Sequence, residues 1–132
     1  MVLPGGEQAV MDFQDALQGP RQYDLVALLR DSYVELPRDF VDQMLDVYLE
    51  AFAKETGEKI EPKGFKSFFD LLTVQRKLKD AGRFEFINRV KGNPGFLVSI
   101  PASLRYVKAA FDVQPQLAPL RKLIAHYVPE LA

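Results

Sequence analysis

The chain has 132 residues, of which 48% are hydrophobic and 27% charged, and its formal net charge at pH 7 is −1. These values are typical of one globular domain with a hydrophobic core of its own. The absence of cysteine excludes disulfides and thiolate metal sites. No apolar run is long enough to span a bilayer, so we expect a cytoplasmic protein without a membrane partner.

Charge is distributed unevenly along the chain. Residues 1–62 hold 5 basic and 13 acidic side chains, residues 63–91 hold 8 and 3, and residues 92–132 hold 4 and 2. A basic segment can attract phosphates or nucleic acid. Here it is a single stretch without a Gly-rich loop, so it indicates a solvated helix face, and we expect no nucleic-acid partner.

The N-terminal residues predict a β-hairpin followed by a polar loop. Two short apolar runs, Met1–Pro4 and Gln8–Phe13, flank a Gly pair, which is the pattern of two strands joined by a turn. The second run leads directly into Asp12, and the loop after it bends at Gly19-Pro20. Because an acid at the end of a strand can direct its carboxylate into a cleft, Asp12 is the candidate ligand of a cation.

Helical periodicity begins after this loop. Apolar residues at helical spacing predict a largely buried helix over about Tyr23 to Tyr33. Asp24 falls in its first turn, where a carboxylate complements the helix dipole. An acid on so apolar a helix either faces solvent or is fully hydrogen-bonded inside. Asp24 is therefore either a simple capping residue or part of a functional site.

Further amphipathic stretches predict the rest of the fold. They begin at prolines or end at glycines, as helices do, and cover Pro37 to Gly57, Pro62 onward, about Pro101 to Phe111 and about Ala118 to Val128. The stretch from Pro62 either ends near Gly82 or continues through Val90. The predicted fold class is mainly α, with a short N-terminal β-hairpin followed by five to six helices.

Three polar side chains lie close together on the helix that is predicted to begin at Pro62. Gln75 and Lys79 share one face of this helix, and Arg76 lies beside them. Such a trio can hold a sugar hydroxyl together with a carboxylate or phosphate, since Arg is suited to bidentate anion binding. The alternative is that these side chains form surface ion pairs with Asp80 or with another helix.

Several blocks of the chain resemble one family of small-molecule kinases. The most specific block is the N-terminal one, and the similarity extends through most of the 132 residues. The blocks are Val10–Ala16, Gly19-Pro20, Tyr23–Leu25, Leu28–Asp31, Gln75–Lys79, Gly82–Phe84, Ile100-Pro101 and Pro115–Leu120. Together they resemble the aminoglycoside phosphotransferase and choline kinase family, and within it the bacterial kinases of N-acetylmuramate and N-acetylglucosamine.

The resemblance implies a role for each acid of the N-terminal block. Asp12 corresponds to the family's aspartate that holds Mg²⁺ on the phosphates of ATP, a task for which hard carboxylate oxygens are suited. Asp15 is close enough in sequence to contact the metal as well. Asp24 corresponds to the helix acid that braces the catalytic loop by accepting its backbone N–H groups. Mg²⁺ and ATP are thus the cofactors expected of the complete enzyme.

The resemblance also implies that parts of a kinase lie outside this chain. In the family a His-x-Asp-x-x-x-x-Asn loop, with the catalytic base, precedes the hairpin, and a nucleotide-binding lobe precedes that loop. The chain accordingly corresponds to the C-terminal lobe of a protein-kinase-like fold, as one unit with a metal-binding segment over residues 1–22 and a helical subdomain over residues 23–132. We expect the isolated chain to have no kinase activity and to bind neither cofactor.

Two functions follow as alternatives. The first is the substrate-side lobe of a phosphotransferase that acts on a hydroxyl of a cell-wall amino sugar or an aminoglycoside, with the missing N-terminal lobe as its partner. The second is a non-catalytic helical interaction module or pseudokinase remnant. In either case an uncovered apolar face favours a homodimer or a domain swap.

Overall fold

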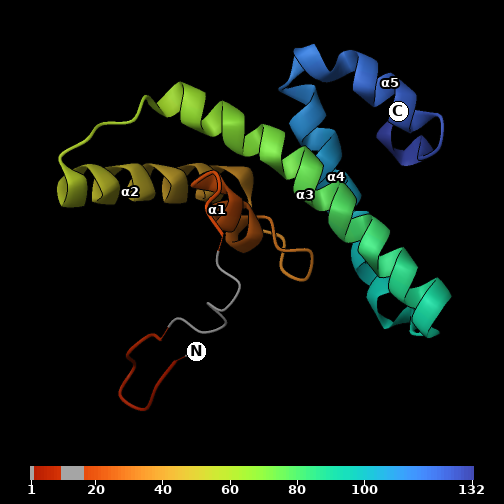
Figure 1. Ribbon diagram of the computed structural model, residues 1–132, viewed down its shortest axis with the longest axis horizontal. Coiled ribbons are helices and arrows are strands. Elements are labelled where there is room, and N and C mark those ends of the chain that lie inside the picture. Colours follow the sequence, from red (N-terminus) through yellow and green to blue (C-terminus); the bar gives the residue numbers. More distant parts are fainter. Residues whose placement is uncertain (1, 10–16) are drawn as a thin grey trace.

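The computed structural model describes residues 2–9 and 17–132, and this part of the chain is almost entirely helical (Figure 1). The predicted mainly α class with five to six helices is confirmed. The elements are α1 (Gln22–Leu29), α2 (Arg38–Thr56), α3 (Pro62–Lys91), the 3-10 helix η1 (Pro94–Ser99), α4 (Ile100–Asp112), η2 (Pro115–Leu117), α5 (Ala118–Ala125) and η3 (Pro129–Leu131). None of the described helices is long and apolar enough to cross a membrane.

The predicted N-terminal hairpin is not confirmed. Within residues 2–9, Val2 and Gln8 form one isolated antiparallel bridge. The turn between them passes through Gly5 and Gly6 at φ values of 103° and 85°, which favour glycine. The rest of the predicted second strand, residues 10–13, lies outside the described residues. One bridge supplies few hydrogen bonds, and even a complete two-stranded ribbon is only marginally stable in water.

Helix α3 is the longest of the described helices, and α1, α2 and α4 all pack against it. It begins where the Glu61 carboxylate accepts hydrogen bonds from the backbone N–H groups of Lys63 and Gly64 at 2.8 and 2.5 Å. It then runs for 30 residues, without interruption at Gly82, and ends at Gly92, where φ is 66°. The structure therefore decides for the longer of the two predicted helices. One interior glycine costs about 1 kcal/mol relative to alanine, which the packing of so long a helix offsets.

Helix α2 matches its prediction closely. Pro37 is the residue before its first turn, and Gly57 ends it in the left-handed conformation at φ 76°. Its buried stripe consists of Val41, Leu45 and Leu49. Figure 1 shows that the chain reverses direction after α2, and the start of α3 packs against the middle of α2, where Phe65 stacks on Tyr48 and Lys66 pairs with Asp46.

Helix α1 is shorter than predicted. It ends at Leu29, whereas the apolar spacing predicted a helix up to Tyr33. Arg30 leaves the helical conformation at φ −120° and ψ 44° and is buried, and Ser32 is buried after it. Tertiary contacts of these two polar side chains with α3 and α4 explain why the helix stops there, since a continued helix would carry them in other directions.

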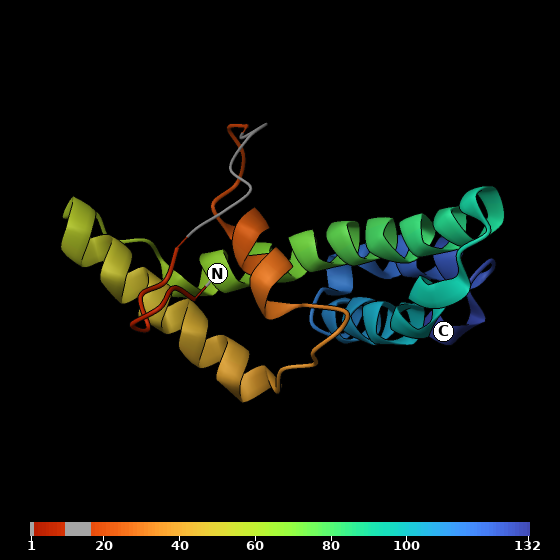
Figure 2. The same ribbon diagram turned by 90° about the horizontal axis from the view of Figure 1, so that it is seen from below.

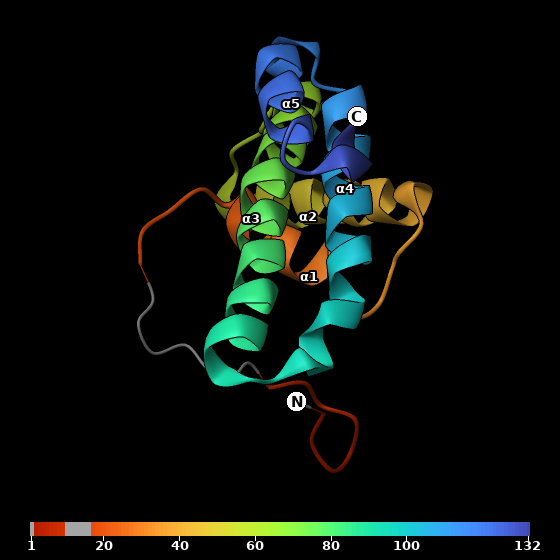
Figure 3. The ribbon, with the colours of Figure 1, turned by 90° about the vertical axis from the view of Figure 1, so that its right-hand side faces the viewer.

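Helix α4 lies beside the C-terminal half of α3, as the views in Figures 2 and 3 agree. It covers the predicted stretch and extends it by one residue at each end. Ser99 precedes it, and its side chain accepts no capping hydrogen bond from the backbone N–H groups of the first turn. The last predicted helix is too long, because α5 ends at Ala125, and Pro129 begins a short 3-10 turn soon afterwards.

Two hydrophobic clusters hold these helices together. The first joins α1, α2 and the N-terminal half of α3, and the second joins α3, α4 and the C-terminus. Their buried members are Val26, Leu29, Val41, Leu45, Leu49, Phe65 and Phe69 in the first cluster, and Val74, Val107, Ala110, Phe111 and Leu131 in the second. Among the described residues, the middle of α3 carries three buried polar side chains, those of Asp70, Thr73 and Lys77.

Candidate functional site

Both acids predicted to contact the metal, Asp12 and Asp15, lie outside the described residues. Their proposed roles therefore stay predictions. The described chain resumes at Leu17, with residues 17–20 exposed, and reaches α1 at Gln22. Among the residues that the structure does describe, no group of three or more His, Cys, Asp or Glu side chains is placed to hold a metal ion.

Asp24 lies in the first turn of α1 and is exposed. Of the two positions open to it, outward or buried, the structure shows the outward one. The residue before the helix, Arg21, makes no side-chain capping hydrogen bond, and its guanidinium lies 4.2 Å from the centre of the Phe52 ring. The acid at Asp24 therefore complements the positive end of the α1 dipole from the surface. Its predicted brace of a catalytic loop remains a prediction.

The predicted trio lies on α3, and the structure ties one member of it to α1. Gln75 and Lys79 are exposed, whereas Arg76 is half-buried with its Cζ atom 4.5 Å from the centre of the Tyr23 ring. A guanidinium over an aromatic face is held by the ring quadrupole. Arg76 is thereby fixed beside the start of α1, which directly follows the segment with the predicted metal ligands.

The predicted ion pairing with Asp80 applies to only one member of the trio. The Lys79 ammonium lies 3.6 Å from an Asp80 carboxylate oxygen. Arg76 makes no ion pair with any described residue, and its Nε atom is buried without a hydrogen-bond partner among them. A buried guanidinium N–H that lacks a partner is costly, and Arg76 is the cation of the trio that has no acidic partner among the described residues.

A buried polar network that the sequence analysis missed lies next to the trio. The Lys77 side chain is only 3% exposed, and its ammonium donates to Ser32 Oγ at 2.9 Å and contacts Asp80 Oδ2 at 2.8 Å. Ser32 Oγ is also 2.8 Å from Ser103 Oγ on α4. The network thus joins the loop after α1 to α3 and α4. One signal could have revealed it, because Lys77 follows Val74 by three positions and precedes Phe84 by seven, on the apolar stripe.

A second buried polar group lies closer to the first hydrophobic cluster. Arg30 is 5% exposed, and its guanidinium lies 5.6 Å from the centre of the Phe69 ring and 5.2 Å from that of Tyr106. Burial lowers the pKa of Arg30, the charge of Arg38 lowers it further, and the Asp70 carboxylate opposes both effects. Burial likewise raises the pKa of Tyr106. Arg30 is therefore a structural cation held between aromatic rings.

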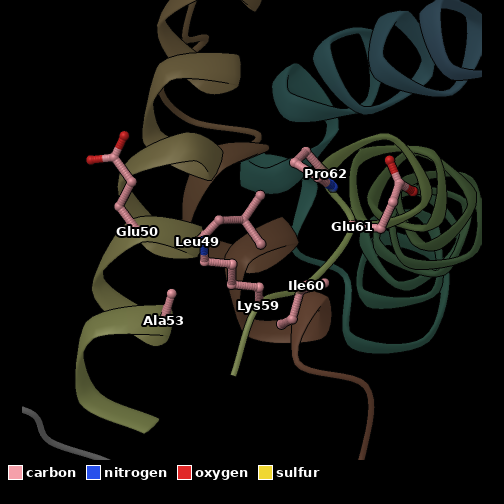
Figure 4. A pocket seen from close by; sticks show the side chains of 7 residues that line it. All are labelled: Leu49, Glu50, Ala53, Lys59, Ile60, Glu61 and Pro62. Atoms are coloured by element: carbon pink, nitrogen blue, oxygen red, sulfur yellow. The ribbon is translucent and has the colours of Figure 1, made fainter. Parts of the chain in front are cut away.

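A surface pocket lies at the other end of α3, where α2 turns into it (Figure 4). Its volume is about 530 Å³, and its lining is mostly apolar, formed by Leu49, Glu50, Ala53, Lys59, Ile60, Glu61 and Pro62. The Glu61 carboxylate is already used to cap α3. Since Arg76 is 14 positions after Pro62, the pocket is roughly 20 Å along the helix from the trio. It is a separate feature from the candidate site.

Sequence comparison identifies the class of protein to which this chain is related. Three curated relatives, all sugar kinases, match the chain at 37% identity, which confirms the resemblance noted from the sequence blocks. No protein-family model matches the chain, and no solved structure does so significantly.

The particular relatives are three N-acetylmuramate/N-acetylglucosamine kinases. The match to the protein of Neisseria meningitidis serogroup B covers 97% of this chain and 39% of that protein, and the match to that of Pseudomonas aeruginosa covers 95% and 37%. The match to the Pseudomonas putida protein covers 88% and 34%. The chain is thus homologous over almost its whole length to part of these kinases, and it spans between a third and two fifths of their length.

Proposed function

We propose that this chain is the substrate-side part of an ATP-dependent kinase that phosphorylates a hydroxyl of a cell-wall amino sugar. The observation that carries the proposal is the 37% identity to kinases of N-acetylmuramate and N-acetylglucosamine over nearly the whole chain. The partly buried, unsatisfied Arg76 beside α1 supports it, since N-acetylmuramate is an anion.

The metal chemistry in this proposal rests on the N-terminal acids. Asp12 holds Mg²⁺, Asp15 contacts the metal or its waters, and Asp24 orients the catalytic loop, in keeping with the family resemblance. Carboxylate oxygens suit Mg²⁺, which would neutralise charge on the phosphates of bound ATP. The catalytic base and the nucleotide lobe come from outside this chain, so positioning of both substrates requires the missing part.

A fusion enzyme tests the proposal directly. The homologous region of the Neisseria meningitidis relative is replaced by this chain, and ADP release is measured with ATP, Mg²⁺ and either amino sugar. We expect sugar-dependent turnover by the fusion and none by the isolated chain, because phosphoryl transfer depends on groups from both parts. An inactive but folded fusion, or sugar phosphorylation by the chain alone, would contradict the proposal.

A second measurement on the fusion concerns Arg76. We expect Arg76→Ala to raise KM for N-acetylmuramate by roughly tenfold to a hundredfold, the effect of losing a charge-assisted hydrogen bond. KM for N-acetylglucosamine, which has no carboxylate, should change little. The matched control is Arg89→Ala on the same helix, because the Arg89 side chain is 76% exposed and pairs with Glu85. An unchanged preference for N-acetylmuramate in Arg76→Ala would remove Arg76 from the sugar site.

A second candidate function is a non-catalytic interaction module that forms a homodimer or a domain swap. Exposed apolar side chains favour it, since Leu17 is 92% exposed and Leu28 on α1 is 70% exposed. Sedimentation of the isolated chain separates the candidates in combination with the fusion assay. A stable dimer together with an inactive fusion would support the module, and an active fusion would support the kinase.

A further inference from the structure

We propose that Tyr33 and Asp80 form a platform for the pyranose ring of the sugar, an inference that rests on the proposed function. Neither residue belongs to the trio predicted from the sequence. Asp80 contacts the buried Lys77 ammonium, which also donates to Ser32, the residue before Tyr33, and the Tyr33 ring contacts Phe84, four positions after Asp80 on α3. The platform would contact the ring that both amino sugars share, whereas Arg76 would contact the carboxylate that only N-acetylmuramate carries.

Tyr33 supplies the flat apolar surface of this platform. It is 65% exposed although its ring contacts other rings, with its centroid 6.3 Å from that of Phe84 at an interplanar angle of 54°. Phe84 is 8% exposed and stacks in turn on Phe96 at 5.8 Å and 5°. The backbone N–H of Tyr33 donates to Asp31 Oδ1 at 2.9 Å. Tyr33 is thus supported from one side and open on the other, which suits stacking against the apolar face of a sugar ring.

Asp80 supplies a hydrogen-bond acceptor about one helical turn before Phe84, the residue that the Tyr33 ring contacts. Its side chain is 19% exposed, with Oδ2 at 2.8 Å from the Lys77 ammonium and Oδ1 at 3.6 Å from that of Lys79. A carboxylate has about four lone-pair sites, so these two contacts leave others for a sugar hydroxyl or acetamido N–H. Hydrogen bonds of hydroxyls to a carboxylate are among the stronger ones.

Lys77 connects the loop that carries Tyr33 to Asp80 on α3. The same ammonium contacts Asp80 and donates to Ser32, the residue directly before Tyr33. Because the Lys77 side chain is 3% exposed and Ser32 is further bonded to Ser103, this junction is fixed. Arg76 is four positions before Asp80 and lies on the same side of α3. The acceptor and the anion-binding side chain are therefore about one turn apart on α3, and the stacking ring contacts the same helix at Phe84.

Binding of N-acetylglucosamine to the isotope-labelled 132-residue chain tests the platform without any catalysis. We expect saturable shifts of the backbone amide signals around Tyr33 and Asp80 in a nuclear magnetic resonance titration, with a Kd of about 1 to 10 mM. Tyr33→Ala should weaken binding about tenfold, since it removes the stacking surface, and Tyr33→Phe should preserve it. Asp80→Asn should weaken binding to a similar extent.

The control is Tyr127→Ala, because Tyr127 is 76% exposed beyond α5 and should not affect sugar binding. Tyr33 is itself exposed, so its replacement leaves the hydrophobic clusters intact. Absence of saturable shifts, or equal affinity of Tyr33→Ala and the parent chain, would overturn the platform.

The fusion enzyme separates failure of the platform from failure of the proposed kinase function. We expect Tyr33→Ala in the fusion to raise KM about tenfold for both amino sugars, with kcat little changed, because the ring contact is made equally before and during reaction. An active fusion whose KM values for both amino sugars are unchanged by Tyr33→Ala would overturn the platform and leave the kinase function standing. An inactive fusion, with Tyr33-dependent sugar binding by the chain, would leave the platform standing and reject the kinase function.

Discussion

Asp70→Asn should lower the free energy of unfolding of the chain by about 3 kcal/mol. Asp70 is 4% exposed and accepts two parallel hydrogen bonds from Arg38, at 2.9 and 3.2 Å. Its charge also acts on the buried Arg30. Removing the carboxylate charge takes away the charge that most opposes the effect of burial on Arg30, which is 5% exposed, and one of the two carboxylates that bind Arg38. The partial exposure of Arg38 keeps the expected cost at the lower end of the range for broken buried pairs.

Urea denaturation followed by circular dichroism measures this effect, with an unchanged m-value as the sign that only stability has altered. Asp42→Asn is the matched control. Asp42 is also bonded to Arg38, at 2.9 and 3.1 Å, but its side chain is 35% exposed. We expect a loss below about 1 kcal/mol there, since exposed ion pairs contribute little. Similar losses of unfolding free energy in the two variants would show that the burial of Asp70 does not determine its contribution to stability.

In the fusion enzyme, Asp12→Ala should lower kcat by roughly 10³-fold while KM for the sugar changes little. A metal that bridges the phosphates stabilises charge that develops during transfer, so its loss affects the chemical step and not the binding of the sugar. Steady-state kinetics at saturating ATP and Mg²⁺ measure both constants. Asp12→Asn should be nearly as impaired, because an amide oxygen is a weaker ligand for Mg²⁺ than a carboxylate.

Asp39→Ala serves as the control for this loss. Asp39 is an exposed acid in the first turn of α2, outside the predicted metal segment. Its removal should leave both constants within about twofold, as expected of a surface substitution. A kcat for Asp12→Ala within tenfold of the parent value would show that Asp12 is not the metal ligand. The match in sequence blocks would then carry no catalytic meaning at this position.

The helices themselves could be predicted because local chemistry decides them. Proline and glycine bracket α2, and Pro62 and Gly92 bracket α3, in accordance with the conformations that these residues favour. The N-terminal hairpin was the least secure prediction, since two short strands gain little without a larger surface to pack on. The length of α3 across Gly82 could not be decided from spacing, because one glycine weakens a helix by only about as much as packing can restore.

The candidate site residues stay predictions. Asp12 and Arg76 follow from the chemistry of their side chains, because carboxylates suit Mg²⁺ and guanidinium groups suit anions, whereas the roles of Asp15 and Asp24 follow from the family resemblance. Which of the trio could receive an anion was not predictable. That depends on Tyr23, which fixes Arg76 from another helix, and on Asp80, which engages Lys79.

The helical class, the starts of the helices and the relationship to sugar kinases could be predicted from the residues alone, because periodicity, turn residues and motif spacing are local properties. The folded chain was needed to show that α1 stops at Leu29, that Lys77 is buried and that its ammonium joins Ser32 to Asp80. These features depend on side chains more than forty positions apart, and the free energy of burying a polar group depends on partners that only the folded chain brings within reach.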